Sequence, residues 1–289
     1  MRKLFFSILL LSAYGISAYE SKFLVEYTME RSSINTNEKV ENLSVINDNL
    51  IFSRGGKVYT TLFNMDNDLR MGEERSDLNA LHISGQFSEY NGVLYYSSNG
   101  LLCSSVMKNG LWVSEGELKI DGYGSQREKG KGSSLFYGRW SYETKGKSKE
   151  LMYNPFIANK GKRLYFTSSM EGGKGGKDIW YIERNADGKT WSAPVNEESV
   201  NTDKDEDYPV LMSDNTLYFS SNRDAKLKGF NIYKKNLSDK KPAVLLDNMY
   251  NSNGNDINFV VVGGIPYFLS DKNGIQNIYF AKLKEVDND

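Results

Sequence analysis

The chain has 289 residues, of which 39% are hydrophobic and 13% aromatic, which is enough for one large domain with a sizeable core. Its 36 basic and 37 acidic residues nearly balance, which argues against a nucleic-acid-binding protein. Cys103 is the only cysteine, so an internal disulfide is excluded.

The first 18 residues have the pattern of a secretory signal peptide. Arg2 and Lys3 precede an apolar stretch over residues 4–11, and the small-residue ending Ile16-Ser17-Ala18 follows. The apolar stretch is too short to span a membrane. We place cleavage after Ala18, with Gly15 and Ser17 as alternatives. Removal of Arg2 and Lys3 leaves 34 basic and 37 acidic residues, a net charge of −3.

A short phrase with two adjacent ring or apolar residues and following hydroxyl residues recurs along the rest of the chain. Its copies are Leu50-Ile51-Phe52-Ser53-Arg54, Leu94-Tyr95-Tyr96-Ser97-Ser98-Asn99, Leu164-Tyr165-Phe166-Thr167-Ser168-Ser169, Leu217-Tyr218-Phe219-Ser220-Ser221-Asn222 and Pro266-Tyr267-Phe268-Leu269-Ser270-Asp271. From Ile51 to Tyr95, Tyr165, Tyr218 and Tyr267 the steps are 44, 70, 53 and 49 residues. Such self-similarity is typical of repeat architectures, and four-stranded propeller blades repeat every 40–50 residues or so.

The repeat region predicts antiparallel strands. Apolar and polar residues alternate, and dipeptides such as Asn91-Gly92, Asp187-Gly188 and Asn273-Gly274 suit tight hairpins. In one unit we expect strands at 153–158, 163–168 and 178–183, with an outer strand near Trp191. No long helical pattern follows the signal peptide. The sequence therefore predicts an all-β fold, a β-propeller of four-stranded blades.

The last unit has strands at 256–262, 265–269 and 277–283 and lacks a fourth. The apolar run at 23–29 has no repeat of its own, so we predict that it supplies this strand and closes the ring. We expect five blades in a single domain over residues 19–289, with an insertion around 104–150. The alternative is a sixth, degenerate blade within that insertion.

Residues 153–222 carry a family resemblance. The runs Tyr153-Asn154-Pro155-Phe156, Gly161-Lys162-Arg163-Leu164-Tyr165-Phe166-Thr167-Ser168 and Lys177-Asp178-Ile179-Trp180 look like a WD40-like, TolB-type propeller repeat. The continuation through Trp191-Ser192-Ala193-Pro194-Val195-Asn196 and Asp205-Glu206-Asp207-Tyr208-Pro209 is similar to Bacteroidetes envelope proteins of the OmpA-family and PorE-like type. The resemblance implies a periplasmic or outer-membrane-peripheral location, a scaffold role and no catalytic residues. The chain lacks the OmpA-like domain and the lipoprotein cysteine of those proteins, so peptidoglycan anchoring is not carried over.

Several residues have both a possible chemical role and a structural explanation. Asp178, Asn231 and Asn277 hold equivalent places in three units, which favours turn-bonding roles. The Gly-rich run over residues 172–177 lacks the Ser or Thr and the helix of a phosphate loop, so we expect a hairpin. Asp203, Asp205 and Asp207 alternate as Ca²⁺ ligands do, but Tyr208 stands where a calcium loop of the EF-hand type needs Gly. They are weak metal candidates.

Catalysis has little support in the sequence. His82 is the only histidine, and the neighbours of Cys103 suggest a packed thiol. A glycosidase needs two opposed carboxylates. Asp207 and Asp256 both begin predicted inner strands and could face the central channel, which is the basis of the hydrolase alternative. We expect no enzyme activity and no cofactor.

Residues 126–150 differ in character from the repeats. Seven basic residues stand against three acidic ones, a local charge of +4, and aromatic residues are interleaved. Arg, Trp and Tyr often anchor protein interfaces. We predict a partner-binding surface carried by Arg127, Arg139, Trp140 and Tyr142, the structural alternative being a solvated loop packed on a blade.

The preferred function is a non-catalytic propeller that binds envelope proteins, in the manner of outer-membrane or secretion-associated scaffolds. The first alternative is a carbohydrate- or muropeptide-binding module, and the second is a degenerate glycoside-active enzyme. No second stretch approaches the length of a membrane span.

Overall fold

The computed structural model describes residues 27–63, 69–123 and 151–283. Almost all the regular structure in these ranges is antiparallel strand, grouped in five four-stranded units. Helix there is limited to α1 (Ser76–Asn79) and the 3₁₀ turn η1 (Asn159–Gly161).

The strands of the five units are as follows. The first unit is β2 (Val40–Ile46), β3 (Asn49–Arg54), β4 (Lys57–Phe63) and β5 (Leu69–Glu74). The second is β6 (Ser88–Tyr90), β7 (Val93–Ser98), β8 (Leu101–Lys108) and β9 (Leu111–Glu117). The third is β10 (Met152–Ala158), β11 (Arg163–Ser168), β12 (Asp178–Glu183) and β13 (Val195–Asn196); the fourth is β14 (Glu206–Leu211), β15 (Thr216–Ser221), β16 (Asn231–Asn236) and β17 (Val244–Leu245); the fifth is β18 (Asp256–Val262), β19 (Ile265–Ser270), β20 (Asn277–Leu283) and β1 (Tyr27–Arg31).

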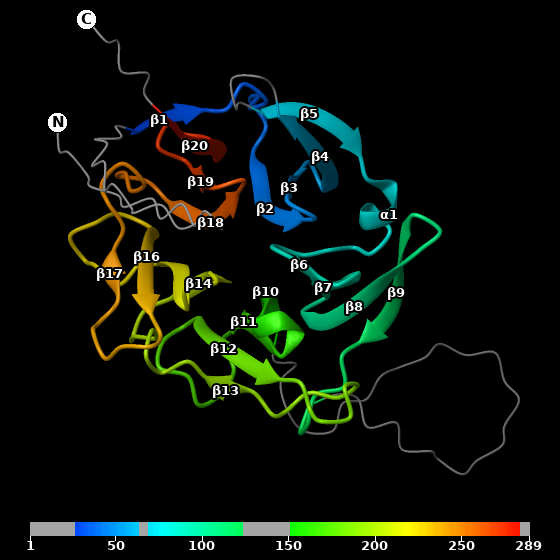
Figure 1. Ribbon diagram of the computed structural model, residues 1–289. Coiled ribbons are helices and arrows are strands. Elements are labelled where there is room, and N and C mark those ends of the chain that lie inside the picture. The colour runs from blue at the N-terminus through cyan, green and yellow to red at the C-terminus, as the bar shows by residue number, and fades with distance from the viewer. Residues whose placement is uncertain (1–26, 64–68, 124–150, 284–289) are drawn as a thin grey trace, which may run out of the picture.

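The units surround a common centre, with the first strand of each unit innermost (Figure 1). Each inner strand contacts the next, in the closed cycle β2, β6, β10, β14, β18 and back to β2. β2 and β6 also share one parallel bridge, between Val45 and Ser88, which joins the first two units into one formal sheet. This arrangement is a β-propeller, as the repeat predicted.

The N-terminal strand closes the ring, which confirms the predicted closure. β1 pairs antiparallel with β20 from Tyr27 opposite Leu283 to Arg31 opposite Tyr279. Figure 1 shows β1 lying on the outer side of β20. The described part of this strand begins at Tyr27, and residues 23–26 of the predicted run lie outside the described residues. The fifth unit is thus built from both ends of the described chain, and β20 has no open edge.

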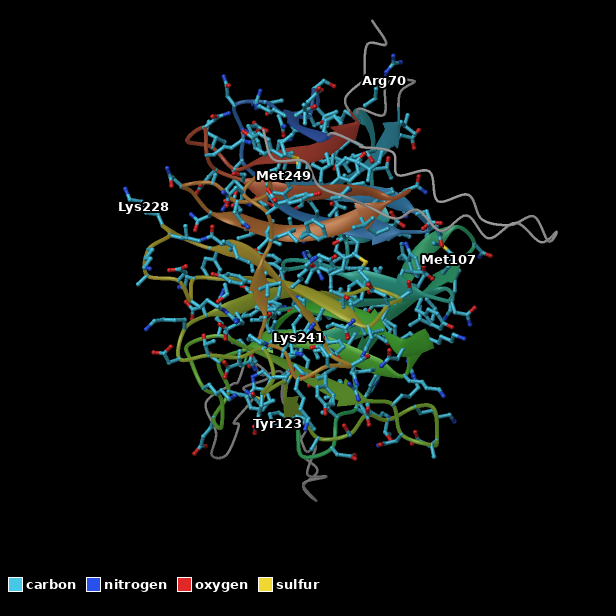
Figure 2. All side chains as sticks on the ribbon, turned by 60° about the vertical axis from the view of Figure 1, so that its left-hand side comes forward. Arg70, Met107, Tyr123, Lys228, Lys241 and Met249 are labelled. Atoms are coloured by element: carbon cyan, nitrogen blue, oxygen red, sulfur yellow. The ribbon has the colours of Figure 1, made fainter. Side chains whose placement is uncertain are left out.

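The repeat aromatics are buried on both faces of each sheet. Phe166 packs into a cluster with Tyr95 and Leu102 of the second unit, whereas Tyr165 packs into one with Phe219 of the fourth. Adjacent residues of a strand point to opposite faces, so one phrase serves two interfaces. Side chains fill the space between the sheets, while Arg70, Met107 and Lys228 lie at the edge of the molecule (Figure 2).

A repeated backbone contact links neighbouring units at four of the five junctions. The first N–H of an inner strand donates to the carbonyl of the residue that precedes the third strand of the unit before it. The distances are 2.9 Å for Met152 to Gly100, 2.7 Å for Glu206 to Lys177, 2.8 Å for Asp256 to Phe230 and 3.0 Å for Val40 to Gln276. The contact satisfies backbone groups at the strand ends, where water would otherwise have to reach them.

Two expectations need adjustment. The outer strand of the third unit is Val195–Asn196, and Trp191 makes only isolated bridges to Arg184 and Ile120. The start of the predicted insertion, residues 104–117, forms part of β8, β9 and the turn between them in the second unit. The rest of the insertion, 124–150, lies outside the described residues, as does any sixth unit within it. No helix in the described ranges has the length and apolar character needed to cross a bilayer.

Candidate functional site

The inner strands of the last three units share a distortion at mid-length. Asn154, Tyr208 and Asn258 have φ of 53°, 55° and 56°, and the strand pairing shifts register at the same places. An extra residue of this kind is a β-bulge, which bends the strand and redirects a side chain. At Asn154 and Asn258 the bulge residue carries an amide side chain, and both amides bond to Gln86.

These side chains form a buried polar network, the axial network, centred on Gln86. Asn258 Nδ2 donates to Gln86 Oε1 at 2.9 Å, and Gln86 Nε2 donates to the carbonyl of Pro209 at 3.0 Å. The backbone N–H of Gln86 donates to Asn154 Oδ1 at 2.8 Å, and Asn154 Nδ2 donates to Asp207 Oδ1 at 2.6 Å. All four side chains are no more than 4% exposed. The axial network therefore closes the centre of the ring and ties the second, third, fourth and fifth units together.

The first unit joins the axial network through one backbone N–H, and a serine side chain bonds beside it. The N–H of Leu43 donates to Asn258 Oδ1 at 2.5 Å, and Ser44 Oγ accepts from the N–H of Phe87 at 2.9 Å. Ser88 Oγ accepts from the N–H of Ile157 at 2.8 Å. Every unit thus contributes to the contacts at the centre, and the polar groups that lie there have partners, as burial demands.

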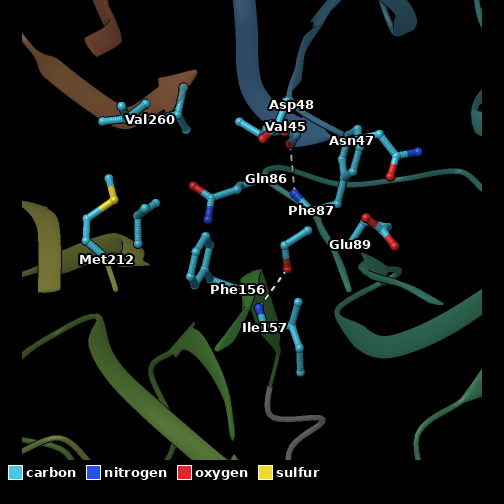
Figure 3. A pocket seen from close by; sticks show the side chains of 14 residues that line it. Val45, Asn47, Asp48, Gln86, Phe87, Glu89, Phe156, Ile157, Met212 and Val260 are labelled. Carbon is cyan, nitrogen blue, oxygen red and sulfur yellow. Dashed lines mark hydrogen bonds between the residues drawn. The ribbon is translucent and has the colours of Figure 1, made fainter. Parts of the chain in front are cut away.

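A cavity of about 390 Å³ lies beside the axial network, at the end of the ring where the inner strands finish. All five units contribute to it. Val45, Phe156, Val210, Met212 and Val260 supply apolar walls, and Gln86 lies at the centre. In Figure 3, Gln86 and Phe156 point into the middle of the space, with Met212 and Val260 on one side and Asn47 and Glu89 on the other.

The charged groups of the cavity are carboxylates. Asp48 is exposed in the turn between β2 and β3, and half-buried Glu89 lies on β6. The turn residues Asn47 and Asp48 have φ of 48° and 58°, which suits a two-residue hairpin and holds Asp48 in place. Glu89 Oε1 accepts from the N–H of Gly92 at 2.6 Å, so this side chain caps the next hairpin. No Lys, Arg or His is among the described residues that line the cavity.

The opposite face of the ring carries two buried carboxylates at the starts of β14 and β18. Glu206 accepts from the hydroxyls of Thr202 and Ser221 and pairs with Arg223 at 3.1 Å. Burial lowers the pKa of Arg223, against the opposing effect of Glu206. Asp256 accepts from the N–H of Ser252 at 2.5 Å, and burial raises its pKa. These groups tie the connections between units to the strands and have little contact with water.

The structure separates the residues weighed for metal binding or hydrolysis. Asp203 is exposed and pairs with Lys204, whereas Asp205 accepts from the N–H of Lys177. Asp207 is buried in the axial network and pairs with Lys177 Nζ at 2.9 Å. The residues described contain no group of three or more His, Cys, Asp or Glu side chains positioned to hold a metal. Neither Asp207 nor Asp256 lines the cavity, so the pair expected for hydrolysis does not face this cavity.

The equivalent polar residues that begin the third strands do bond to the turns before them. Asp178 accepts from the N–H of Gly175 at 3.3 Å, Asn231 Nδ2 donates to Gly229 and Asn277 Nδ2 donates to Ile275. The run over residues 172–177 connects β11 and β12 as a loop. A Cβ at position 175 would lie 1.8 Å from the carbonyl oxygen of Lys204, so glycine is required there by a close approach of backbone.

The single histidine and the single cysteine both lie away from the cavity. His82 is exposed in a turn after α1 with φ of 51°, and Cys103 is buried in the second unit. Burial raises the pKa of the Cys103 thiol to about 11, which agrees with a packed, unreactive thiol. Arg127, Arg139, Trp140 and Tyr142 lie outside the described residues.

Sequence reasoning missed the residues that hold the centre and its cavity. Gln86, Asp48 and Glu89 stand in or beside hairpins of the weaker repeats, where nothing in the local pattern marks them. Asn154 and Asn258 carried a detectable signal, because both stand two residues after the start of an inner strand. Comparison of the inner strands with one another could have found that pair.

Comparisons with known proteins add no family. No family model matches the chain, and no curated protein matches it. Among solved structures, a provisionally assigned glycoside hydrolase from Parabacteroides distasonis has 9% identity and a TM-score of 0.46, with 84% of this chain and 86% of that chain covered. A provisionally assigned gluconolactonase has 14% identity and a TM-score of 0.42, with 89% and 92% covered. A family GH43 endo-arabinanase from Bacillus licheniformis has 12% identity and a TM-score of 0.43, with 89% and 98% covered. At these values no ligand or reaction is carried over to this chain.

Proposed function

We propose that the protein is a non-catalytic β-propeller of the cell envelope that binds a segment of a partner protein at the central cavity. The observation that carries this proposal is the chemistry of the cavity. Its walls are Val, Ile, Met and Phe side chains, and its polar groups are confined to the centre and the rim. A concave apolar space with a few placed polar groups suits an inserted apolar side chain, whose burial contributes about 1.5–3 kcal/mol.

A protein ligand fits the cavity better than a sugar. Sugar rings stack on broad aromatic faces and need many hydrogen-bonding groups. Trp and Tyr are absent from the described lining, and Trp112, Trp180 and Trp191 are each buried elsewhere, no more than 5% exposed. Carbohydrate or muropeptide binding is therefore the second candidate.

Hydrolysis is the third candidate, and the carboxylates give it little support. Asp207 is held by Asn154 and Lys177, and Asp256 by Ser252. A general acid must donate a proton to the substrate within hydrogen-bond reach. Neither carboxyl lines the cavity, so neither is placed to do so for a ligand bound there. The envelope location is supported by the signal-peptide pattern of residues 1–18 and by the resemblance of residues 153–222.

A photo-crosslinking experiment tests partner binding. A photoreactive phenylalanine analogue is placed at Met212, which lines the cavity, or at Lys228, an exposed loop residue that does not. The proposal expects a discrete crosslinked protein from the Met212 position in envelope extracts and none from the Lys228 position. Equal crosslinking from both positions contradicts it. A glycan array and a panel of chromogenic glycosides, run on the same protein, address the other two candidates.

The basic and aromatic segment stays a separate prediction about the partner surface. If residues 126–150 bind a partner, simultaneous change of Arg127, Arg139 and Trp140 to Ala abolishes the same crosslink while the melting temperature is kept. Loss of folding in that variant would instead assign the segment a structural role.

A further inference from the structure

The two carboxylates of the cavity have no cationic partner inside the described protein. Asp48 and Glu89 form none of the ion pairs there, although other acids, such as Asp77, Glu183 and Asp207, are paired with nearby Lys or Arg. Glu89 uses one oxygen to cap the turn at Gly92, and no bond is formed by the other within the described residues. Carboxylate oxygens that could accept hydrogen bonds are therefore free at the cavity, and no described residue of its lining carries a positive charge.

The same carboxylates are held by regular structure. Asp48 is fixed by the hairpin between β2 and β3, and Glu89 belongs to β6, which bridges to β2 at Val45 and Ser88. They come from adjacent units and border one cavity. The backbone of both residues is therefore fixed, and the bond to Gly92 also orients the Glu89 side chain, which lowers the ordering cost when a cation binds.

We propose that the partner segment bound at the cavity is basic: an apolar side chain fills the cavity while a neighbouring Lys or Arg lies against Asp48 and Glu89. This inference rests on the proposed function and names the chemistry of its partner. Charge complementarity favours this occupant, because the lining is apolar with acidic residues and has no basic ones. An acidic segment would meet like charges, and a purely apolar one would leave the carboxylates beside low-dielectric surface.

The axial network sets how far such a segment enters. Gln86 is 1% exposed at the centre of the cavity, and Asn154, Asp207 and Asn258 are buried beside it. Since these bonded side chains close the centre of the ring, the ligand enters and leaves at one face. A single side chain or a short loop fits this geometry, and a strand threaded through the ring does not.

The electrostatic effect is expected to be moderate. Ion pairs near solvent have small energies and are weakened by salt, so they govern specificity and association rate more than total affinity. Removal of both charges should weaken binding roughly three- to tenfold at low ionic strength. The dependence of affinity on salt should largely disappear with them.

The probe comes from a random linear peptide library displayed on phage. The library is selected against the full-length protein. Enriched peptides are synthesised and titrated against four proteins: the parent, Met212→Trp, the double variant Asp48→Asn with Glu89→Gln, and a control with Glu171→Gln and Glu198→Gln. The double variant keeps the local structure, because Asn accepts positive φ and Gln retains the oxygen that caps Gly92. The control changes net charge equally at exposed residues that do not line the cavity.

The proposal expects enriched peptides with Lys or Arg next to an apolar residue. It expects loss of binding in Met212→Trp, three- to tenfold weaker binding in the double variant, and unchanged binding in the control. Two outcomes overturn this inference but not the proposed function. In the first, peptides that lose binding to Met212→Trp lack basic residues. In the second, the peptides bind the double variant as tightly as the parent. Peptides insensitive to Met212→Trp, or a library that yields none, overturn both. Melting temperatures of all four proteins confirm that each is folded.

Discussion

Asn35 and Ile278 lie 243 positions apart in sequence and are joined by two hydrogen bonds. Asn35 Nδ2 donates to the carbonyl of Ile278 at 2.8 Å, and the N–H of Ile278 donates to Asn35 Oδ1 at 2.9 Å. The side chain of Asn35 thus pairs with β20 as a strand residue would. Asn201 makes the same pair of bonds with Ile179, and Asn251 with Ile232. In three of the connections between units, one Asn side chain thus fastens the connection to the third strand of a neighbouring sheet.

Replacement of Asn35 by Ala should lower the free energy of unfolding by about 1–3 kcal/mol, because the N–H of buried Ile278 loses its acceptor. The carbonyl of Ile278 keeps the N–H of Ser32 as a donor. Chemical denaturation followed by tryptophan fluorescence measures the change. Asn37→Ala, two residues along the same connection at an exposed position, is the matched control and should be near neutral. Equal stabilities of the two variants would contradict a fastening role for Asn35.

Deletion of residues 19–31 removes β1 and exposes the edge of β20. We expect a sharply lower melting temperature and aggregation, since an open strand edge invites pairing with other chains. Deletion of residues 19–26 alone keeps β1 and is the control. Calorimetry measures the melting temperature and light scattering measures aggregation. If the 19–31 deletion has the same melting temperature as its control, closure by β1 does not stabilise the fold.

Phe219→Ala should cost about 3–5 kcal/mol, because the ring is fully buried between the third and fourth units. Leu62→Ala, at a side chain 59% exposed on β4, should change stability little. Urea titration of both variants measures the difference. A Phe219 variant as stable as the Leu62 variant would show that the interface between these units does not contribute.

Gln86→Leu tests the axial network. The Leu side chain has nearly the same size but leaves Asn258 Nδ2 and the Pro209 carbonyl without their partner. Each buried group left unpaired costs about 1–3 kcal/mol. We therefore expect a clear loss of stability, measured by thermal unfolding. An unchanged or higher melting temperature would mean that water or neighbouring groups replace the amide.

Cys103 should react slowly with thiol reagents near pH 8 in the folded protein and rapidly after denaturation. Burial raises the pKa of its thiol to about 11, whereas a thiol in an unfolded chain has a pKa of about 8.5. The folded protein keeps a proton that the unfolded chain loses between these values. The contribution of this site to stability is therefore full below about pH 8.5 and falls as pH rises toward 11. Fast labelling of the native protein at pH 8 would contradict the burial of the thiol.

The fold could be predicted from local patterns. The repeated aromatic phrase and alternation placed β11, β12, β18 and β20 at their observed bounds or within a residue of them, and the missing fourth strand identified β1 as the closing element. The outer strand of the third unit was misplaced at Trp191, because Val195–Asn196 is too short for any alternation to show. The start of the insertion was misplaced because the phrase at Tyr95 is weaker, and the two strands after it lack a recognisable copy.

Strand period, turn residues and repeat spacing act over a few residues, so the sequence by itself determined the all-β class, the repeating unit and the closure of the ring. The tertiary structure alone decided which polar residues meet at its centre. Asn258 reaches Gln86 across 172 positions, and Asp48 and Glu89 border the same cavity from different units. Such contacts depend on how many units close the ring and on where bulges turn the inner strands. No local pattern of a single strand encodes that geometry, because it arises only when all the sheets pack around one axis.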